Sequence, residues 1–388
     1  MHSPSVIRPR SSPAEVMQTL RRLGPMSRPE LAQRLGVANS TVAAHVEMLI
    51  EAGMIEDIGV GGSRGGRRPR LIQIRDDGAC VAAVELGSKH ARLGLLNMRG
   101  QLRCSEDFAV ELDDGPDAVL QAIARRLNQL SREQGVSRLT GAGIGVPGPV
   151  DRESGRIAGP SRMPGWGGLR VSDQLQSLLD VPVVADNDAN LLTLGEYRTR
   201  WAGNDVQHLV AVKVGRGIGC GIIASGDLHY GANGSAGDIS HVRLSGDGEE
   251  AIPCGCGNKG CIETVASGAA VLAQLTRAGE PAESLAQVVE RTASGDPLSN
   301  ALLRHGGSVV GEALAVVVNF FNPQVLLIGG VLSGADVFVS ALRASVYDRT
   351  LRLANESLEV AVVQSGADAG LLGAGSLILD LLGDRAEV

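Results

Sequence analysis

The chain has 388 residues, 44% of them hydrophobic and 20% charged, so it can bury more than one core and two or three domains are expected. We expect no apolar run long enough to cross a membrane and no signal peptide. The net charge of −7 is uneven: residues 1–75 hold 11 Arg, no Lys and 6 acidic residues, a net +5, which leaves −12 on the remainder. This split favours a nucleic-acid-binding module on an acidic body, although surface solubility alone could also produce it.

Helix signals begin soon after the N-terminus. Residues 1–11 are rich in Pro, Ser and Arg and are expected to be disordered. Two helix starts follow, at Ser12 and at Ser27, each with a serine N-cap, a proline in the first turn and a glutamate three residues after the serine. A third helix is predicted from Asn39 to just before Gly53. Helices joined by tight turns are the arrangement of a helix-turn-helix.

A wing is predicted next, with strands at residues 54–60 and 70–74 and a loop rich in Gly and Arg between them. In a winged module at residues 12–76, the third helix would enter the major groove of operator DNA and the wing arginines would contact the minor groove or phosphates. Use of the helix-turn-helix for protein docking alone is the alternative, which the arginine loop disfavours. The candidate DNA-binding residues are Ser40, Thr41, Ala44, His45, Arg64, Arg67, Arg68 and Arg70.

The acidic body shows two similar series of strands. Apolar runs predict strands at 80–86, 92–97, 142–146 and 181–185, with a long helix before the third. A comparable series opens with strands at 209–214 and 218–224. Two such units indicate two lobes with a cleft between them. Further helices are predicted at 264–277, 285–293, 298–321 and 370–382.

Polar residues follow the strand at 181–185, in the order Asp186-Asn187-Asp188. Ligands of open α/β sheets bind at the carboxyl ends of the strands. An amide and a carboxylate at this position can donate and accept hydrogen bonds with a polar ligand. Asn and Asp also favour helix N-caps, and the two roles are compatible.

Three of the six cysteines lie within eight residues, at Cys254, Cys256 and Cys261, and His241 precedes them. Three thiolates and one imidazole form a common tetrahedral set for structural Zn²⁺, and the interspersed glycines let the short loop fold back. A redox pair or simply buried cysteines would fit this spacing less well. Clustered, reduced thiols also indicate a cytoplasmic location.

His241, the Cys254-Gly-Cys256-Gly-Asn-Lys-Gly-Cys261 loop and the following Ile-Glu263-Thr resemble the ROK family of repressors, uncharacterised reading frames and sugar kinases. The resemblance covers nearly the whole chain. It implies an α/β fold in which the winged helix-turn-helix precedes a two-lobed, actin-like (sugar kinase/ribonuclease H-like) domain at residues 77–388. Lobe I is expected at about 77–200 plus the C-terminal helix at 368–388, and lobe II at about 201–367.

The resemblance also implies a sugar site braced by the zinc loop. Glu263 matches a family glutamate that binds a sugar hydroxyl, and Asp188 matches the catalytic base of the ROK kinases. Asp238 stands where the family usually has Glu, and Arg162 stands where it usually has Asn, which would favour a sugar phosphate. His241 could contact sugar with one ring nitrogen and zinc with the other. The implied sugar-binding residues are Asn187, Asp188, Asp238, His241, Glu263 and Arg162.

The nucleotide-binding turns of the family are altered in this chain. Its first turn reads Glu85-Leu-Gly87-Ser88-Lys89 instead of Asp-x-Gly-Gly-Thr-Lys, and Arg216 replaces the threonine of the second turn. Phosphoryl transfer needs a carboxylate for Mg²⁺ and small residues at the phosphates, so these departures argue against ATP and Mg²⁺ as cofactors. The degenerate nucleotide-binding residues are Glu85, Gly87, Ser88, Gly215, Gly217, Gly219, Gly329 and Gly330.

These observations predict a sugar-responsive ROK-family transcriptional regulator, a repressor acting as a dimer or tetramer, in which a sugar or sugar phosphate in the cleft modulates operator binding. The alternative is an ATP-dependent hexose kinase fused to a DNA-binding domain, with Asp188 as its catalytic residue. A third interpretation is a binding module without a ligand, whose pocket motifs are relics.

Overall fold

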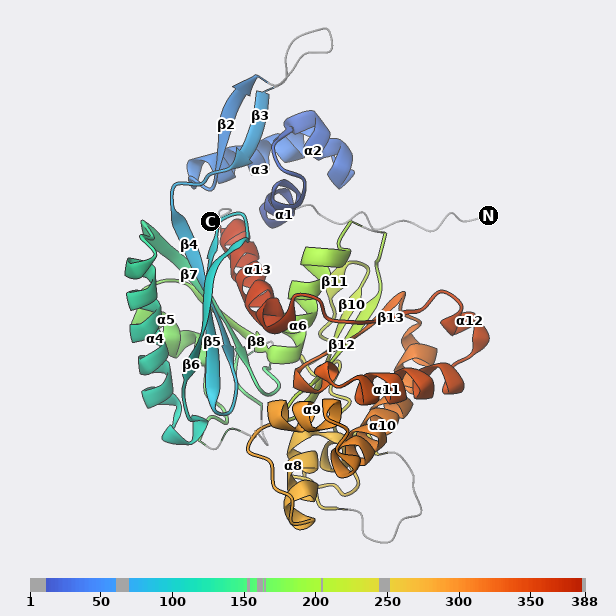
Figure 1. The fold of residues 1–388 in the computed structure, drawn as a ribbon. Helices are drawn as coiled ribbons and strands as arrows, with labels where there is room; N and C mark the ends of the chain where they lie inside the picture. Colours follow the sequence, from blue (N-terminus) through green and yellow to red (C-terminus); the bar gives the residue numbers. More distant parts are fainter. Residues whose placement is uncertain are drawn as a thin grey trace.

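The computed structural model describes residues 12–60, 70–151, 154–158, 163, 165–203, 205–243 and 252–385. An N-terminal module lies above a body of two lobes, and the C-terminal helix returns to the junction between module and body (Figure 1).

The N-terminal module has three helices and a small sheet. The helices are α1 (Pro13–Leu23), α2 (Arg28–Leu35) and α3 (Asn39–Glu51), and the sheet has the order β1 (Met26–Ser27), β3 (Arg70–Ile74), β2 (Ile55–Val60). Both predicted capping boxes form: Ser12 accepts from the backbone N–H of Glu15, Ser27 from that of Glu30, and each glutamate accepts from its serine's N–H. The predicted winged helix-turn-helix is confirmed in its described part.

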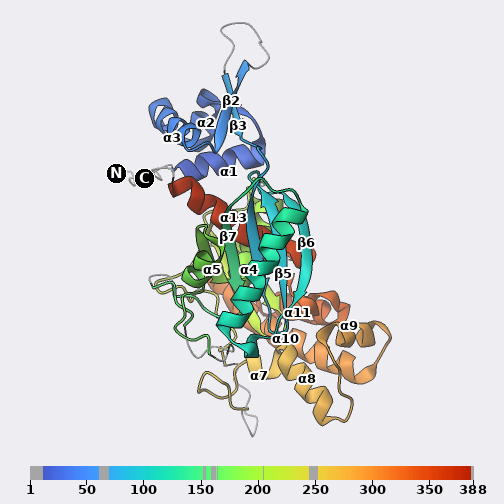
Figure 2. The ribbon, with the colours of Figure 1, turned by 90° about the vertical axis from the view of Figure 1, so that its left-hand side faces the viewer.

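Lobe I contains a five-stranded sheet with helices on both faces. Its strand order is β6 (Leu102–Ala109), β5 (His90–Asn97), β4 (Ala79–Leu86), β7 (Arg138–Val146), β8 (Val183–Asn187). Side chains alternate along β4, so Val84 packs in the core under one pair of helices and Ala83 in the core under the other. The first pair is α4 (Pro116–Glu133), which lies in front of the sheet in Figure 2, and α5 (Val171–Leu179). The second pair is α6 (Asp188–Glu196) and α13 (Ala369–Asp384) (Figure 1).

Lobe II repeats this strand pattern. Its order is β11 (Asp227–Leu228), β10 (Ile218–Ala224), β9 (Leu209–Val214), β12 (Val325–Gly329), β13 (Glu359–Val362). In both sheets three antiparallel strands are continued by two parallel ones, as the two similar sequence units predict. The helices are α7 (Glu263–Ala266), α8 (Gly268–Arg277), α9 (Leu285–Ala293), α10 (Pro297–Phe321), α11 (Asp336–Arg349) and α12 (Arg352–Asn355).

The helix predicted at residues 264–277 is broken in the structure. Ser267 has extended backbone angles and its hydroxyl accepts from Ala270 N at 3.2 Å, so it ends α7 and caps α8. Short helical turns also occur at Leu112–Asp114, Tyr197–Trp201, Val331–Gly334 and Gly366–Asp368; the second is a π-helix that continues α6.

Two stretches are long and apolar enough to cross a membrane by length and composition alone, α10 and residues 366–384 around α13. The expectation that no run approaches this length is therefore wrong. Half of each apolar window is buried inside the protein, and α10 packs on α11 while α13 packs on α6. The buried half of each helix packs in the core, whereas α10 also exposes Val316 (63%) and Phe320 (91%).

Candidate functional site

A cavity of about 600 Å³ lies between the two lobes, within the size range of small-molecule sites. Every predicted nucleotide-binding residue lines it, namely Glu85, Gly87, Ser88, Gly215, Gly217, Gly219, Gly329 and Gly330. Four of the predicted sugar-binding residues line it as well: Asn187, Asp188, Asp238 and His241. The fold thus brings residues from β4, β8, α6, β9 and β10 to one cleft.

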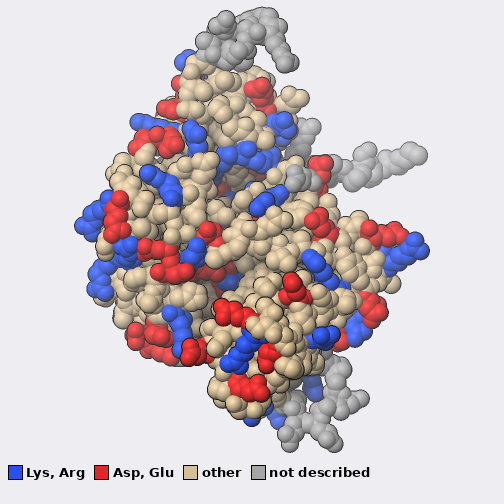
Figure 3. Space-filling model, in the orientation of Figure 1, with Lys and Arg blue, Asp and Glu red and all other residues tan. Residues whose placement is uncertain are grey.

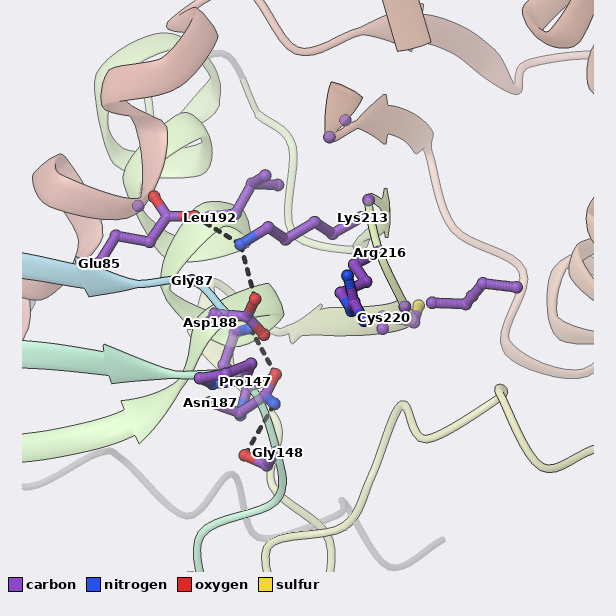
Figure 4. Close-up of a pocket in the computed structure, with 18 of the residues that line it drawn as sticks. Glu85, Gly87, Pro147, Gly148, Asn187, Asp188, Leu192, Lys213, Arg216 and Cys220 are labelled. Carbon is purple, nitrogen blue, oxygen red and sulfur yellow. Dashed lines mark hydrogen bonds and ion pairs between the residues drawn. The ribbon is translucent and has the colours of Figure 1, made fainter. Parts of the chain in front are cut away.

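A lysine that the sequence analysis did not select lies at the centre of the cleft (Figure 4). The ammonium of Lys213, on β9 of lobe II, donates to Asp188 Oδ2 at 2.6 Å and to Glu85 Oε1, both on lobe I. One cation therefore bridges the carboxylate matched to the kinase base and the carboxylate matched to the metal-binding position.

The charge of Lys213 is stabilised by these partners. Burial by itself would lower the pKa of its ammonium, but the charges of Asp188 and Glu85 outweigh burial and raise that pKa above its ordinary value. A signal for this residue was present in the sequence, because a lysine interrupts the apolar strand Leu209–Val214 and a buried charge requires a partner.

Asn187 has the N-cap role that the sequence left open. Its side-chain oxygen accepts from the backbone N–H groups of Ala189 and Asn190 at 2.9 and 3.3 Å, and its amide donates to Gly148 O at 2.9 Å. These bonds leave one amide N–H for a ligand. Asp188, one residue later, faces Lys213, so the capping and cleft roles fall on neighbouring residues.

Asp186, next to this pair, is buried and connects the lobes. It accepts from Asn190 Nδ2 at 3.0 Å and from the hydroxyl of Tyr230, a lobe II residue, at 2.7 Å. The start of α6 is therefore held from both sides of the cleft.

The other predicted sugar contacts differ in position. The carboxylate of Asp238 accepts from the hydroxyl of Ser240 at 2.7 Å, and both line the cavity. Glu263 is only 6% exposed and does not line the cavity; its carboxylate accepts from Ile218 N at 3.1 Å, so it supports the wall from behind. Direct contact between Glu263 and a sugar stays a prediction. Arg162 lies outside the described residues.

The predicted metal ligands converge. The ligand atoms of His241, Cys254, Cys256 and Cys261 all lie within 4.8 Å of one another. His241 Nδ1 is 3.5 Å from Cys254 Sγ, and Cys256 Sγ is 3.7 Å from Cys261 Sγ. Sulfurs bound tetrahedrally to one Zn²⁺ at about 2.3 Å would be about 3.8 Å apart, so the donor set and its spacing fit this ion. His241 also lines the cavity and connects the cluster to the cleft wall.

The third helix of the N-terminal module presents only part of the predicted DNA-binding face. Ser40 and Ala44 are exposed and Thr41 is half-buried. His45 is buried, 8% exposed, because it follows Val42 by three residues and falls on the inward side of α3. Its placement on the outward face was wrong.

Arg70 is the one wing arginine of the predicted set within the described residues, since Arg64, Arg67 and Arg68 fall in the undescribed loop. Its side chain is 70% exposed and pairs with Asp57 at 2.9 Å. Arg28 on α2 lies 3.9 Å from the same carboxylate and pairs with Glu47 on α3 at 2.6 Å. These pairs connect the base of the wing to the helix-turn-helix.

A two-lobed, actin-like body with a central cleft, preceded by a winged helix-turn-helix, defines a sugar-kinase-type fold joined to a DNA-binding module. The chain belongs to the ROK family, whose profile matches residues 81–380, and a helix-turn-helix domain profile matches residues 11–58.

Relatives that are similar along nearly the whole chain include regulators. The xylose repressor of Bacillus subtilis strain 168 is 27% identical over 371 residues, which cover 94% of each chain. The crystal structure of a ROK family transcriptional regulator, a homolog of the E. coli MLC protein, superposes with a TM-score of 0.78 at 26% identity and covers 96% of each chain. The predicted family, fold class and functional class, a ROK transcriptional regulator, are thereby confirmed.

The body alone is also similar to kinases. A ROK family glucokinase from Streptomyces griseus, in complex with glucose and AMPPNP, superposes with a TM-score of 0.64 at 25% identity. It covers 77% of this chain and 98% of its own. The cleft geometry must therefore distinguish regulation from phosphoryl transfer.

Proposed function

We propose that this chain is a sugar-responsive transcriptional repressor that does not phosphorylate its sugar. The observation that carries the proposal is the ammonium of Lys213 between Glu85 and Asp188. A kinase needs a divalent cation near the phosphates and a carboxylate free to accept the proton of the attacked hydroxyl. In this cleft a fixed protein cation engages both carboxylates.

The same cluster suits the reversible binding of a sugar. Asp188 is held as an oriented acceptor, Asn187 keeps one amide donor, and Asp238, Ser240 and His241 add polar groups on the opposite wall. The carboxylates of Asp188 and Asp238 can accept hydrogen bonds from sugar hydroxyls, so we propose a neutral sugar as the effector; Arg216 also lines the cavity and is the described cation that a sugar phosphate would meet there. A role for Arg162 in holding a phosphate remains part of the test.

A structural zinc ion would fit the cluster of His241, Cys254, Cys256 and Cys261. Its thiolate and imidazole bonds would hold the loop that carries one wall of the cleft. Four protein ligands would fill the tetrahedral coordination of the zinc ion and leave no position for a water molecule. The ion would therefore have a structural role and no catalytic one.

Operator binding is assigned to the exposed side of α3, with Ser40, Thr41 and Ala44, and to the arginines of the wing, Arg64, Arg67, Arg68 and Arg70. A helix-turn-helix protein usually reads two half-sites, so we propose a homodimer or homotetramer acting in the cytoplasm. We assign the N-terminal module to residues 12–76 and the ROK body to residues 77–388.

Binding and turnover must be measured in parallel on the full chain. Calorimetry with D-xylose, D-glucose, N-acetyl-D-glucosamine and their phosphates should give binding of a free sugar, and a coupled ADP-release assay with ATP and Mg²⁺ should give no turnover. Asp188→Ala should weaken binding by about 10-fold or more, since a hydrogen bond to a charged group contributes about 1.5–3 kcal/mol.

Asp348→Asn is the matched control, because Asp348 is 79% exposed on α11, and it should bind sugar as the wild type does. Turnover that depends on Asp188 would establish the rival kinase. Tight binding of a sugar phosphate with weak binding of the free sugar would refute the assignment of a neutral effector.

A further inference from the structure

The C-terminal helix α13 touches both the cleft and the N-terminal module. Gly370, in its first turn, packs so closely on the side chain of Glu85 that a Cβ at this position would overlap the carboxylate. Glu85 is a partner of Lys213 in the cleft. At the other end of α13, Gly383 faces Ala14 of α1, where an added Cβ would come within 3.0 Å of the Ala14 Cα. Gly370 also lines the cavity, and Figure 1 shows that the other end of α13 lies beside α1.

Arg21, whose side chain is 10% exposed, fixes α1 to the end of α13. The guanidinium of Arg21 donates to the carbonyl oxygens of Met98 and Leu379, both at 3.2 Å, and pairs with Asp380 at 3.4 Å. The other oxygen of Asp380 pairs with Arg198, on the π-helix that follows α6, at 2.5 Å. Basic side chains are visible at this junction in Figure 3. Burial lowers the pKa of Arg21 to about 10, and the charge of Asp380 opposes that shift.

The helix is also fastened at its cleft end. Arg92 of β5 donates to Asp368, which precedes α13, at 2.8 Å. The carboxylate of Glu196, at the end of α6, accepts from the N–H groups of Gln364 and Ser365 at 2.9 and 3.0 Å. From Gly370 to Asp380 the helix rises by about 15 Å. A rigid element of this length, fixed at both ends, can pass a small displacement from one site to the other.

We propose that α13 transmits the state of the cleft to the DNA-binding module, and that Arg21, Asp380 and Arg198 form the joint at which α1 follows α13. The inference rests on the proposed function, because it assumes that occupancy of the cleft controls the module. When lobe II closes, Lys213 moves relative to its partner Glu85. The side chain of Glu85 packs against Gly370 in the first turn of α13, so the movement reaches the helix. The buried joint then carries that movement to α1, and with it to α3 in the same core.

The test is a double-mutant cycle read by hydrogen–deuterium exchange on the full chain, and it needs neither a known sugar nor a known operator. Lys213→Met perturbs the cleft, and Asp380→Asn releases the joint while keeping the size of the side chain. In the wild-type background we expect Lys213→Met to change the exchange rates of α1 amides by about threefold or more. In the Asp380→Asn background the change should fall to about 1.5-fold or less.

Arg126→Gln is the matched control, because it removes a cation of α4 that pairs with Glu106 on β6 and Glu133 on α4, and it should leave α1 exchange unchanged. If Asp380→Asn does not fold, Arg21→Gln opens the same joint from the other side. An equal effect of Lys213→Met in both backgrounds would overturn the proposal, as would an effect confined to the lobes. Both outcomes differ from a failure of the proposed function, which would appear as absent sugar binding or as ADP release.

Discussion

Replacing Lys213 by methionine removes the positive charge that lies between Glu85 and Asp188 and keeps a side chain of similar length. The two carboxylates would then face each other without a counter-charge. Their side chains and that of Lys213 retain 17–19% exposure, so we take the lower end of the cost of breaking a buried ion pair, about 3 kcal/mol. For a body of roughly 300 residues, an unfolding entropy of about 2.1 cal/mol/K per residue converts that cost into a decrease in Tm of about 5 °C.

The loss should depend on pH with a defined sign. In the wild type the charges of Asp188 and Glu85 outweigh burial and raise the pKa of the Lys213 ammonium above its unfolded value of 10.5. The stability that Lys213 contributes is therefore fully present below that unfolded pKa and is lost as pH rises above it. Differential scanning calorimetry should show a decrease in Tm for Lys213→Met at pH 8 that becomes smaller above about pH 11.

Two controls separate this effect from a general loss of charge. Adding Glu85→Gln to Lys213→Met should restore part of the lost Tm, because one of the facing charges is removed. Arg352→Met breaks a pair with Glu356 in which the arginine is 90% exposed, and it should change stability by no more than about 0.5 kcal/mol. An unchanged Tm for Lys213→Met at pH 8 would refute the reasoning.

Cys261→Ser should abolish zinc binding and lower Tm, and elemental analysis should give about one zinc per wild-type chain and none in the variant; zinc-free wild type would contradict the site. Ser40→Ala should weaken binding to DNA selected from a random pool and leave Tm within about 2 °C. His45→Ala, at a buried position, should lower Tm by several times that amount. The reverse pattern would show that the side chain of His45 points outward from α3. Burial raises the pKa of Cys220 to about 12, so iodoacetamide should not label this thiol in the folded chain at pH 8. The folded state favours the neutral thiol, so the stability contributed by Cys220 is present below the unfolded pKa of about 9 and is lost as pH rises from there toward 12. Rapid labelling by iodoacetamide at pH 8 would contradict this prediction, because it would show that Cys220 is accessible.

Local features of this protein were predictable because their interactions span a few residues. Ser12 and Ser27 cap their helices through glutamates three residues away, and strands such as Ile218–Ala224 follow their apolar runs. The short Cys254–Cys261 loop limits how far its sulfurs can separate, and these sulfurs lie together with His241 Nδ1. Side-chain direction on a helix was less certain: the exposed position of Ser40 was predicted correctly and that of His45 was not.

Contacts between distant segments were decided by the tertiary structure. Lys213 meets Glu85 across 128 residues and Asp188 across 25, because the two lobes bring the ends of β9, β4 and α6 together. Glu263 supports the cleft wall from behind instead of lining the cavity, because its carboxylate accepts a hydrogen bond from Ile218 N, at the start of β10 and 45 residues away in sequence.

The amino-acid sequence by itself determined that a basic winged helix-turn-helix precedes a two-lobed body with a Cys₃His cluster, since periodicity, capping and ligand spacing are local properties of the chain. The tertiary structure decided that a lysine lies between the two cleft carboxylates and that α13 reaches both the cleft and α1. The physical reason is that these contacts depend on the packing of lobes and helices far apart in sequence, which no local pattern specifies.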